Sequence, residues 1–407
     1  MRKHLNGRDP ETKVKIIKLI YQTYLPYQGR YPRVSGQAKI LQESGFDVTV
    51  LACDREGSHP GREILEGIQV QRIPVKTREM RGPFKQTLPL LLFWIKSLKW
   101  LLIHQVDILH CHNLDVLPVG CLAKLLKGCR VLFDAHEPNY YALWPKKWKP
   151  ILKPLKAFER VSARSVDTIS VTNHYQVQKY QKMGARRVEL VGNYPHPCLG
   201  ATEVDEEKFL RTHVTFGRLG TIYPEIGIEA SVEAFIRIIE VYPQARLLIA
   251  GRVVDNHKED FLRMIEPIRN RLQLLGAYPA QKMPDLYRQI DVSLLIYPKS
   301  AWFRNITPRK FFDSLANGVP VIMTDIGGLG RLIREHECGL VVDERNIGTI
   351  IEPMSRLIDD PSLRRKMALN AFRLASTNFD WQTMARRFVD LQKDLMIRQG
   401  QDLYEKR

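Results

Sequence analysis

The chain has 407 residues, too many for one ordinary hydrophobic core, and it suits two α/β domains of roughly 200 residues each. Hydrophobic residues make up 44% and charged residues 26%, which excludes disordered and fibrous proteins. The net charge of +18 implies a field that attracts nucleic acid, anionic lipid or phosphorylated substrates. Six cysteines without metal-ligand spacing, and no apolar segment after the N-terminus, predict a reduced cytosolic protein without a secretory signal.

Strands and helices are predicted to alternate along the first half of the chain. The expected strands are 14–21, 47–52, 68–73, 107–111, 130–134, 167–171 and 187–191. The expected helices are 35–44, a long apolar helix around 88–103, and 117–126. Such alternation is typical of a parallel sheet covered by helices on both faces.

A second alternating series follows a predicted linker over 193–208, which contains two prolines, a glycine and four acidic residues. Its expected strands are 213–216, 245–249, 272–275, 292–296, 319–323 and 339–342, with helices over 226–242, 258–269 and 284–289. The predicted fold class is therefore α/β, with two doubly wound Rossmann-like domains that face a cleft. Ligands of such sheets bind outside the carboxyl ends of the strands.

The segment 308–323 predicts an anion site at the start of a helix. Residues 311, 312, 315 and 316 form one apolar helical face, and Asp313 lies off that face. Asn317-Gly318 and Pro320 end the helix before a buried strand. Arg309 and Lys310 add two cations to the free N–H groups of the helix start, which indicates a phosphate seat. The alternative is an ordinary solvated helix end.

Two basic segments suggest which kind of partner the protein binds. Residues 76–105 carry six Lys or Arg against one Glu around an apolar stretch, and residues 144–164 carry seven against Glu159, mixed with Trp144 and Trp148. Basic residues among Trp and Leu suit a segment that lies in the interface of an anionic membrane. The alternative is a pair of domain helices with solvated faces. No nucleic-acid-binding pattern accompanies the charge, so we expect no nucleic acid partner.

Six motifs in order resemble those of GT-B-fold glycosyltransferases, in particular the family-4 retaining group. They are 31–50, His110-Cys-His-Asn-Leu-Asp-Val-Leu-Pro (110–118), Phe133-Asp-Ala-His-Glu (133–137), 276–295, Pro308-Arg-Lys-Phe-Phe-Asp with Gly318-Val-Pro-Val-Ile, and 360–381. The resemblance implies an acceptor-binding domain over 1–195, a donor-binding domain over 205–380, and a last helix, 381–407, that packs back on the first domain.

The resemblance also implies the reaction. We expect retaining transfer of a sugar from a UDP or GDP type nucleotide sugar to a lipid-linked, polysaccharide or glycolipid acceptor, without a cofactor or an obligatory metal. We expect a cytoplasmic enzyme, peripheral on the inner membrane face. The alternatives are a non-catalytic GT-B-like binding protein and a sugar-nucleotide epimerase of the same architecture, which would need more carboxylates than the sequence offers.

The expected site residues fall into three groups. The catalytic residues are His136, which would steer the acceptor proton, and Lys310, which would neutralise the diphosphate. Donor contacts are expected from Arg218, Gly220, Thr221, Asn305, Thr307, Arg309, Lys310 and Asp313. Acceptor contacts are expected from Arg33, His112, Asp134 and Glu137.

The motifs depart from the family pattern at two places. Its E-x7-E pair is here Asn305 and Asp313, and Ile226 stands where a basic residue usually helps to hold the diphosphate. Arg218 is nearby in the sequence. His110 and His112 share a strand face, as a metal site would need, but no third ligand follows at suitable spacing, so both are interpreted as structural or substrate-lining.

Overall fold

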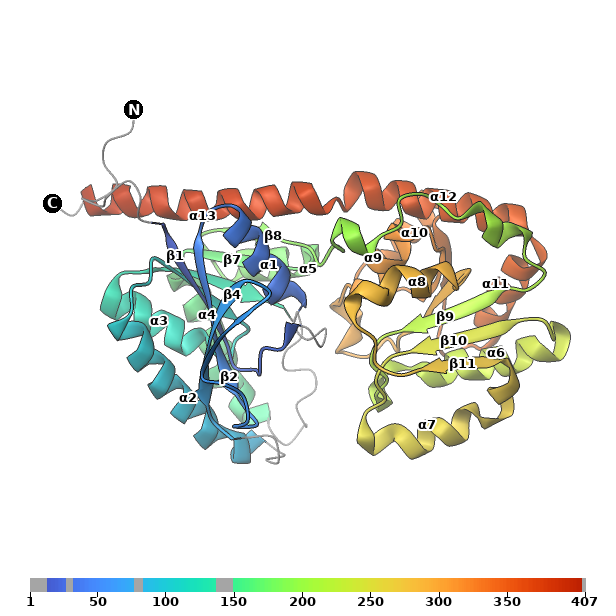
Figure 1. The fold of residues 1–407 in the computed structure, drawn as a ribbon, viewed down its shortest axis with the longest axis horizontal. Coiled ribbons are helices and arrows are strands. Elements are labelled where there is room, and N and C mark those ends of the chain that lie inside the picture. Colours follow the sequence, from blue (N-terminus) through green and yellow to red (C-terminus); the bar gives the residue numbers. More distant parts are fainter. Residues whose placement is uncertain (1–12, 27–31, 77–82, 137–148, 405–407) are drawn as a thin grey trace. The chain divides into compact units, whose positions relative to one another are not determined.

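The computed structural model describes residues 13–26, 32–76, 83–136 and 149–404, and the chain divides into two compact units. Unit 1 comprises residues 1–192 and 382–407, and unit 2 comprises residues 193–381. Each unit contains one sheet covered by helices (Figure 1). The predicted α/β class with two doubly wound sheets is confirmed. No helix in the described ranges is long and apolar enough to cross a membrane.

The sheet of unit 1 has eight strands in the order β3-β4-β2-β1-β5-β6-β7-β8. All neighbours are parallel except β3 and β4, and β3 was not predicted. The strands are β1 (Lys15–Ile20), β2 (Asp47–Asp54), β3 (Arg62–Leu65), β4 (Ile68–Pro74), β5 (Ile108–His112), β6 (Arg130–Ala135), β7 (Thr168–Val171) and β8 (Val188–Leu190). The order reverses between β1 and β5, which places the switch point of this sheet there.

Successive side chains of β5 enter two different environments. Leu109 and Cys111 join an apolar core shared with helices α2 (Pro83–Ile103) and α3 (Leu117–Lys127). His110 and His112 point to the opposite face, where His110 contacts helix α13 (Trp381–Tyr404). Because side chains alternate along a strand, one face of this sheet is apolar and the other carries buried polar groups. The other helices of unit 1 are α1 (Pro32–Glu43), α4 (Lys149–Ser165) and α5 (His174–Lys182).

Helix α13 belongs to unit 1 although it follows unit 2 in the chain. The side chains of Phe388, Leu391 and Leu395 are buried there, as is Gln392. Burial of such side chains contributes about 1.5 to 3 kcal/mol each, so this helix is part of the core of unit 1.

We expect Phe388→Ala to destabilise unit 1 by about 3 to 5 kcal/mol, because it leaves a cavity at a fully buried position. The measurement is denaturant unfolding followed by fluorescence and by hydrogen exchange in each unit. Ile397→Ala on the same helix is the matched control, because Ile397 is 58% exposed, and it should change stability by less than about 0.5 kcal/mol. Equal effects of the two variants would contradict the packing of α13 described here.

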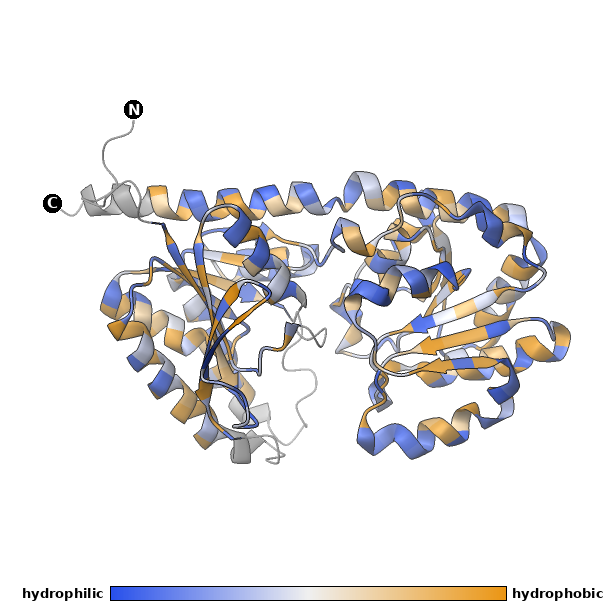
Figure 2. Ribbon diagram, viewed as in Figure 1, coloured by the Kyte–Doolittle hydropathy of each residue, from blue (hydrophilic) through white to orange (hydrophobic). Residues whose placement is uncertain are grey.

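The sheet of unit 2 has six parallel strands in the order β11-β10-β9-β12-β13-β14. The strands are β9 (Thr215–Leu219), β10 (Arg246–Ala250), β11 (Leu272–Leu275), β12 (Val292–Leu295), β13 (Val321–Thr324) and β14 (Gly339–Val342). The helices are α6 (Ile228–Val241), α7 (Lys258–Ile265), α8 (Met283–Arg288), α9 (Arg309–Ala316), α10 (Leu329–His336), α11 (Gly348–Asp359) and α12 (Pro361–Asn378). Figure 2 shows hydrophobic colour along much of β10 and β11. The order reverses between β9 and β12, the switch point of this sheet.

Two expectations are corrected within unit 2. The predicted linker over 193–208 packs as part of the unit: Lys208 is 4% exposed, and its Nζ donates to the carbonyls of Tyr287 and Ile290 at 2.7 and 2.8 Å. Asp313 was expected off the buried face of its helix, but it is fully buried. Helix α9 contacts β12 and β13 as well as α12, so more than one of its faces is covered.

Candidate functional site

The predicted donor residues gather at the switch point of unit 2. Gly220 directly follows β9, and α9 is the helix that follows β12. Loops that leave the carboxyl ends of two such strands diverge and leave room for a ligand between them. Gly220 has φ +118°, and a Cβ atom there would lie 3.4 Å from Cε of Lys310. The positive φ therefore favours glycine here, whereas a Cβ atom would make only ordinary contact with the lysine.

The start of α9 concentrates charge. Lys310 Nζ lies 3.1 Å from Asp313 Oδ2, and Arg309 Nε lies 3.3 Å from Asp313 Oδ1. The side chain of Lys310 is 23% exposed, whereas that of Asp313 is fully buried. Lys310 Nζ also lies 3.5 Å from the hydroxyl of Tyr278. Lys310 is thus a partly exposed cation held by a buried carboxylate at a helix N-terminus, which is a favourable place for an anion.

Electrostatics keep Lys310 charged. Burial of its ammonium lowers its pKa, but the Asp313 carboxylate and then Tyr278 outweigh burial, so the pKa of Lys310 is raised above its ordinary value. A raised lysine pKa means a permanent positive charge at neutral pH. The charge of Asp313 compensates only one of the two cations beside it, Arg309 and Lys310. The pair therefore keeps a net positive charge at the start of α9.

The other predicted donor residues are placed less uniformly. Thr221 is exposed beside Gly220, and Asn305 is half-buried before α9. Thr307 Oγ1 is buried and has no hydrogen-bond partner among the described residues, so it is a polar atom that a ligand can satisfy. Arg218 is only 4% exposed: its guanidinium lies 4.5 Å from the ring centroid of Tyr297. Arg218 therefore packs near the carboxyl end of β9, two residues before Gly220, and its contact with the donor stays a prediction.

Ile226 has a structural role. It is 6% exposed and belongs to the apolar core of unit 2. It lies between β9 and α6, just before Gly227, which adopts a left-handed conformation at φ +76°. A basic side chain at this position would have to be buried in that core. Packing in the apolar core thus accounts for an apolar side chain at this position, where the family usually has a cation.

Unit 1 contains a second polar cluster centred on Asp134. Arg33 Nη2 lies 2.6 Å from Oδ1 of the carboxylate, and its Nε lies 3.0 Å from Oδ2. Ser170 Oγ donates to Oδ1 at 2.5 Å, and Gln37 Nε2 donates to Oδ2 at 3.1 Å. Burial alone would raise the pKa of Asp134, but Arg33 and the neighbouring histidine His136 lower it well below its usual range. Asp134 is therefore a buried carboxylate.

His112 and His136 both contact Oδ2 of Asp134. His136 Nε2 lies 3.1 Å from this oxygen and His112 Nδ1 lies 3.2 Å from it. The two ring nitrogens are 2.9 Å apart. Burial and then Lys18 lower the pKa of His112 well below its usual range, so this ring is neutral. Because a carboxylate only accepts, Nε2 is the ring nitrogen of His136 that can donate to Asp134. The side chain of His136 is 17% exposed.

These three side chains also have the donor types of a metal site. Their ligand atoms lie within 4.8 Å of one another. As a candidate metal ligand, His112 was paired from the sequence with His110 and not with Asp134 and His136. However, both oxygens of Asp134 already accept from Arg33 and one of them accepts from Ser170. A cation would have to displace or approach that guanidinium, so the cluster fits a hydrogen-bonding role better than metal ligation.

The two sites compare with the expectations as follows. Arg33, His112, Asp134 and His136 meet in one cluster, and Glu137 lies outside the described residues. Sequence reasoning missed the side chains that support these clusters. Lys18 and Ser170 were signalled as polar residues within apolar strands, and Tyr278 as the aromatic residue of the 276–295 motif. Gln37, on helix α1, gave no such signal.

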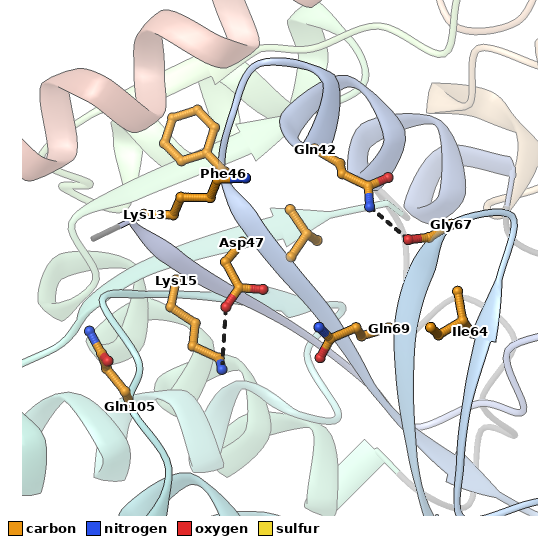
Figure 3. A pocket seen from close by; sticks show the side chains of 10 residues that line it. Lys13, Lys15, Gln42, Phe46, Asp47, Ile64, Gly67, Gln69 and Gln105 are labelled. Atoms are coloured by element: carbon orange, nitrogen blue, oxygen red, sulfur yellow. Dashed lines mark hydrogen bonds and ion pairs between the residues drawn. The ribbon is translucent and has the colours of Figure 1, made fainter. Parts of the chain in front are cut away.

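A cavity of about 470 Å³ lies elsewhere in unit 1 (Figure 3). It opens at the amino ends of β1 and β2, the edge opposite to that of Asp134. Lys15 pairs with Asp47 at 3.4 Å across it, and Gln42 donates to the carbonyl of Gly67 at 2.6 Å. Some of its polar groups thus pair with one another, and it lies at the edge of the sheet opposite to the one where ligands of such sheets bind.

Comparison with known families assigns both halves of the chain. Residues 203–374 match the model of glycosyl transferases group 1. Residues 29–194 match the model of a glycosyl transferase 4-like domain. The two matches fall within unit 2 and mostly within unit 1, and they include the Lys310 and Asp134 clusters, respectively.

Individual relatives are distant but extend over most of the chain. A lipopolysaccharide core biosynthesis mannosyltransferase, LpsB of Rhizobium meliloti, is 22% identical over 70% of this chain and 78% of its own. A GDP-mannose:cellobiosyl-diphosphopolyprenol alpha-mannosyltransferase of Xanthomonas campestris is 21% identical over 93% of this chain and 96% of its own. The structure of sucrose-phosphate synthase from Thermosynechococcus elongatus superimposes with a TM-score of 0.76 at 16% identity, covering 95% of this chain and 100% of that one.

Proposed function

Since the chain is a glycosyltransferase of the GT-B, family-4 type, we propose that it transfers a sugar from a nucleoside-diphosphate sugar with retention of anomeric configuration. The observation that carries this proposal is the Lys310 cluster at the switch point of unit 2. A partly exposed ammonium, a second cation at Arg309 and the N–H groups of a helix start lie together there. This arrangement suits a diphosphate.

The reaction needs stabilisation of the leaving group. As the glycosidic bond breaks, negative charge grows on the diphosphate and positive charge grows on the sugar. Fixed cations and backbone dipoles stabilise the leaving group because they need not reorganise during the step. Lys310 and Arg309 supply this charge, so no metal ion is needed for it, and turnover should persist in a metal chelator.

The Asp134 cluster serves the acceptor side. Asp134 holds the Nε2 proton of His136, which leaves Nδ1 to accept a hydrogen bond or proton from the hydroxyl that attacks the sugar. Arg33 keeps Asp134 ionised and fixed in place. We also propose donor contacts for four further residues of unit 2: Thr221, Asn305, Thr307 and Asp313.

The acceptor that we propose is a lipid-linked or saccharide molecule. The Xanthomonas relative, which matches over nearly the whole chain, is named for GDP-mannose as donor and a diphosphopolyprenol-linked acceptor. The Rhizobium relative is a mannosyltransferase of lipopolysaccharide core biosynthesis. Both names support a lipid-bound glycan as the acceptor, and the Xanthomonas name supports a GDP sugar as the donor.

A thermal-shift screen with UDP, GDP and ADP sugars tests the donor site. One nucleotide class should raise the unfolding temperature of the wild-type protein, and Lys310→Ala should abolish that shift. A control with Lys282→Ala, a lysine of the same unit that is 68% exposed, should keep the shift. Binding that is unaffected by Lys310→Ala would place the diphosphate elsewhere.

Peripheral contact with the cytoplasmic membrane face is the second part of the proposal. Large apolar side chains are exposed along α2 and α3, which contact each other and are marked by recurring hydrophobic colour in Figure 2. Helix α4, next to α3, exposes four cations. Exposed apolar residues beside cations suit the interface of an anionic membrane. The residues are Leu88, Leu91, Leu92, Ile95, Leu102 and Ile103 on α2, Leu122, Leu125 and Leu126 on α3, and Lys153, Lys156, Arg160 and Arg164 on α4.

We expect the protein to sediment with vesicles that contain anionic lipid and to be released by salt, because salt screens the charges. Leu125→Glu should weaken binding by about tenfold or more, since it replaces apolar area and adds a like charge to the lipid. Leu125 is 80% exposed, so the variant should fold. Leu210→Glu, at an 84% exposed leucine of unit 2, is the control and should bind as wild type. Equal binding to neutral vesicles would refute the electrostatic part.

A further inference from the structure

A buried chain of hydrogen bonds joins α13 to Asp134 through the middle of unit 1. Lys18 Nζ lies 2.8 Å from Gln37 Oε1 and 3.2 Å from His110 Nδ1. Gln37 Nε2 lies 3.1 Å from Asp134 Oδ2, and His110 Nε2 lies 2.9 Å from Gln392 Oε1. All five side chains are buried, at 3% exposure or less. Only Asp134 among them has a role in the site described above.

At both ends of this chain the terminal atom, Asp134 Oδ2 or Gln392 Oε1, is an oxygen that accepts. Asp134 is a carboxylate, so Gln37 turns its amide nitrogen toward it and its Oε1 toward Lys18. At the other end Gln392 Nε2 donates to the carbonyl of Phe388 at 3.0 Å, so its Oε1 accepts from His110 Nε2. His110 Nδ1 is then bare and must accept from Lys18. The two ends together require Lys18 to donate in both directions, which an ammonium and an amine can each do.

The arm through Gln37 ends on the oxygen that His136 uses. Oδ1 of Asp134 accepts from Arg33 and Ser170, whereas Oδ2 accepts from Arg33 and Gln37 and faces both His112 and His136. Without Gln37 in this orientation, Oδ2 keeps Arg33 but loses the donor that joins it to Lys18. The state of Lys18 therefore bears on which nitrogen of His136 carries its proton.

The burial of Lys18 costs free energy of folding. This lysine lies in β1 among side chains that are almost all fully buried, and it is itself 0% exposed. Burial lowers its pKa to about 7, with Asp134 opposing the shift and Arg33 adding to it. A buried amine costs desolvation free energy that an isoleucine or leucine would not cost. A second buried lysine, Lys208 in unit 2, donates hydrogen bonds to two backbone carbonyls, those of Tyr287 and Ile290, and contacts no proposed site residue through them.

We infer that Lys18 is a positioning residue. Through Gln37 and Asp134 it fixes the proton of His136 on Nε2. Through His110 it links the packing of α13 at Gln392 to the same chain of hydrogen bonds. Part of this inference, the effect on turnover, rests on the function proposed for His136. The other part, the protonation pattern of the histidines, does not.

The test uses the full chain with ¹⁵N-labelled histidine. The variants are Lys18→Met and Gln37→Met, with Lys208→Met as the control for loss of a buried lysine. NMR near pH 7.5 reports the protonated nitrogen of each ring, and His136→Gln assigns the His136 signals. Wild type and Lys208→Met should show His136 protonated on Nε2. Lys18→Met and Gln37→Met should show a mixture of Nε2 and Nδ1 forms.

The same variants separate positioning from substrate binding. Turnover should fall by about tenfold to a hundredfold in Lys18→Met and Gln37→Met. The Michaelis constant for the nucleotide sugar should stay within about twofold, because the proposed donor contacts are all in unit 2. Gln392→Met should give the same change in a weaker form, since it releases only the arm through His110.

The outcomes divide as follows. An unchanged His136 pattern in a folded Lys18→Met protein overturns the inference, whatever the turnover. If Lys18→Met does not fold by circular dichroism, Gln37→Met, which changes no charge, decides by the same criterion. A changed His136 pattern with normal turnover supports the positioning and contradicts the proposed role of His136 in transfer.

Discussion

Replacing Lys310 with alanine is expected to lower turnover by a hundredfold or more. Loss of one fixed donor at a developing negative charge costs about 2.7 to 4 kcal/mol in comparable sites. On the alternative view Lys310 is a solvated helix-end cation, and such a pair contributes only about 0 to 1 kcal/mol. The structure favours the first view because Lys310 is partly covered, is paired with a fully buried carboxylate and lies against Gly220.

The measurement is steady-state turnover with the donor that the thermal-shift screen identifies. Lys282→Ala is the matched control, because this lysine is in the same unit and is mostly exposed. Circular dichroism must show that Lys310→Ala folds, since Asp313 keeps Arg309 as a partner in that variant. Near-normal turnover would mean that the phosphate seat lies elsewhere. Arg218, two residues before Gly220, would then be the next residue to test.

Asp134→Asn is expected to reduce both stability and turnover. The substitution keeps the shape of the side chain but removes the negative charge that faces Arg33 and His136. Breaking a buried ion pair in this way costs about 3 to 5 kcal/mol, because an uncompensated charge remains. Turnover should fall by about 10²- to 10⁴-fold, the usual contribution of a positioned acid or base, since His136 loses its acceptor.

The pH dependence of stability provides a separate measure of Asp134. Its pKa in the folded protein is below its unfolded value, which is about 3.9. The stabilisation is therefore fully present above about pH 4 and is lost as the pH falls below it toward the folded pKa. Asp134→Asn should flatten this acid limb of the stability curve, measured by denaturant unfolding between pH 2 and 6. Ser170→Ala is the control: it removes one hydrogen bond and should leave the limb in place. An identical acid limb in wild type and Asp134→Asn would contradict the buried carboxylate.

Local sequence signals were sufficient for α9 and for the strand ends that carry the site. The apolar spacing of residues 311–316 and the Asn317-Gly318 stop define a helix, and the structure places it at Arg309–Ala316. Asp134 and His136 come at the end of a strand, where ligands of parallel sheets bind. These predictions depend on neighbours within a few residues, which is where periodicity and turn chemistry are informative.

Burial of polar residues could not be predicted in the same way. The period of α9 shows which face meets the sheet but not that α12, some fifty residues later, covers another side, so Asp313 was wrongly placed off the core. Lys18 finds its partners 92 residues away at His110, and His110 finds Gln392 a further 282 residues away. Such contacts depend on the tertiary arrangement, and a lysine within an apolar strand is the only trace of them in the sequence.

The most direct test of the account follows the stereochemistry of transfer. The purified protein is incubated with the α-linked GDP or UDP sugar that stabilises it and with a diphosphopolyprenol-linked glycan, and ¹H NMR reads the anomeric coupling of the product alongside release of the nucleoside diphosphate. The account predicts an α-linked product, formed in the presence of a metal chelator and lost in Lys310→Ala but not in Lys282→Ala. A β-linked product, or transfer that does not depend on Lys310, would contradict it.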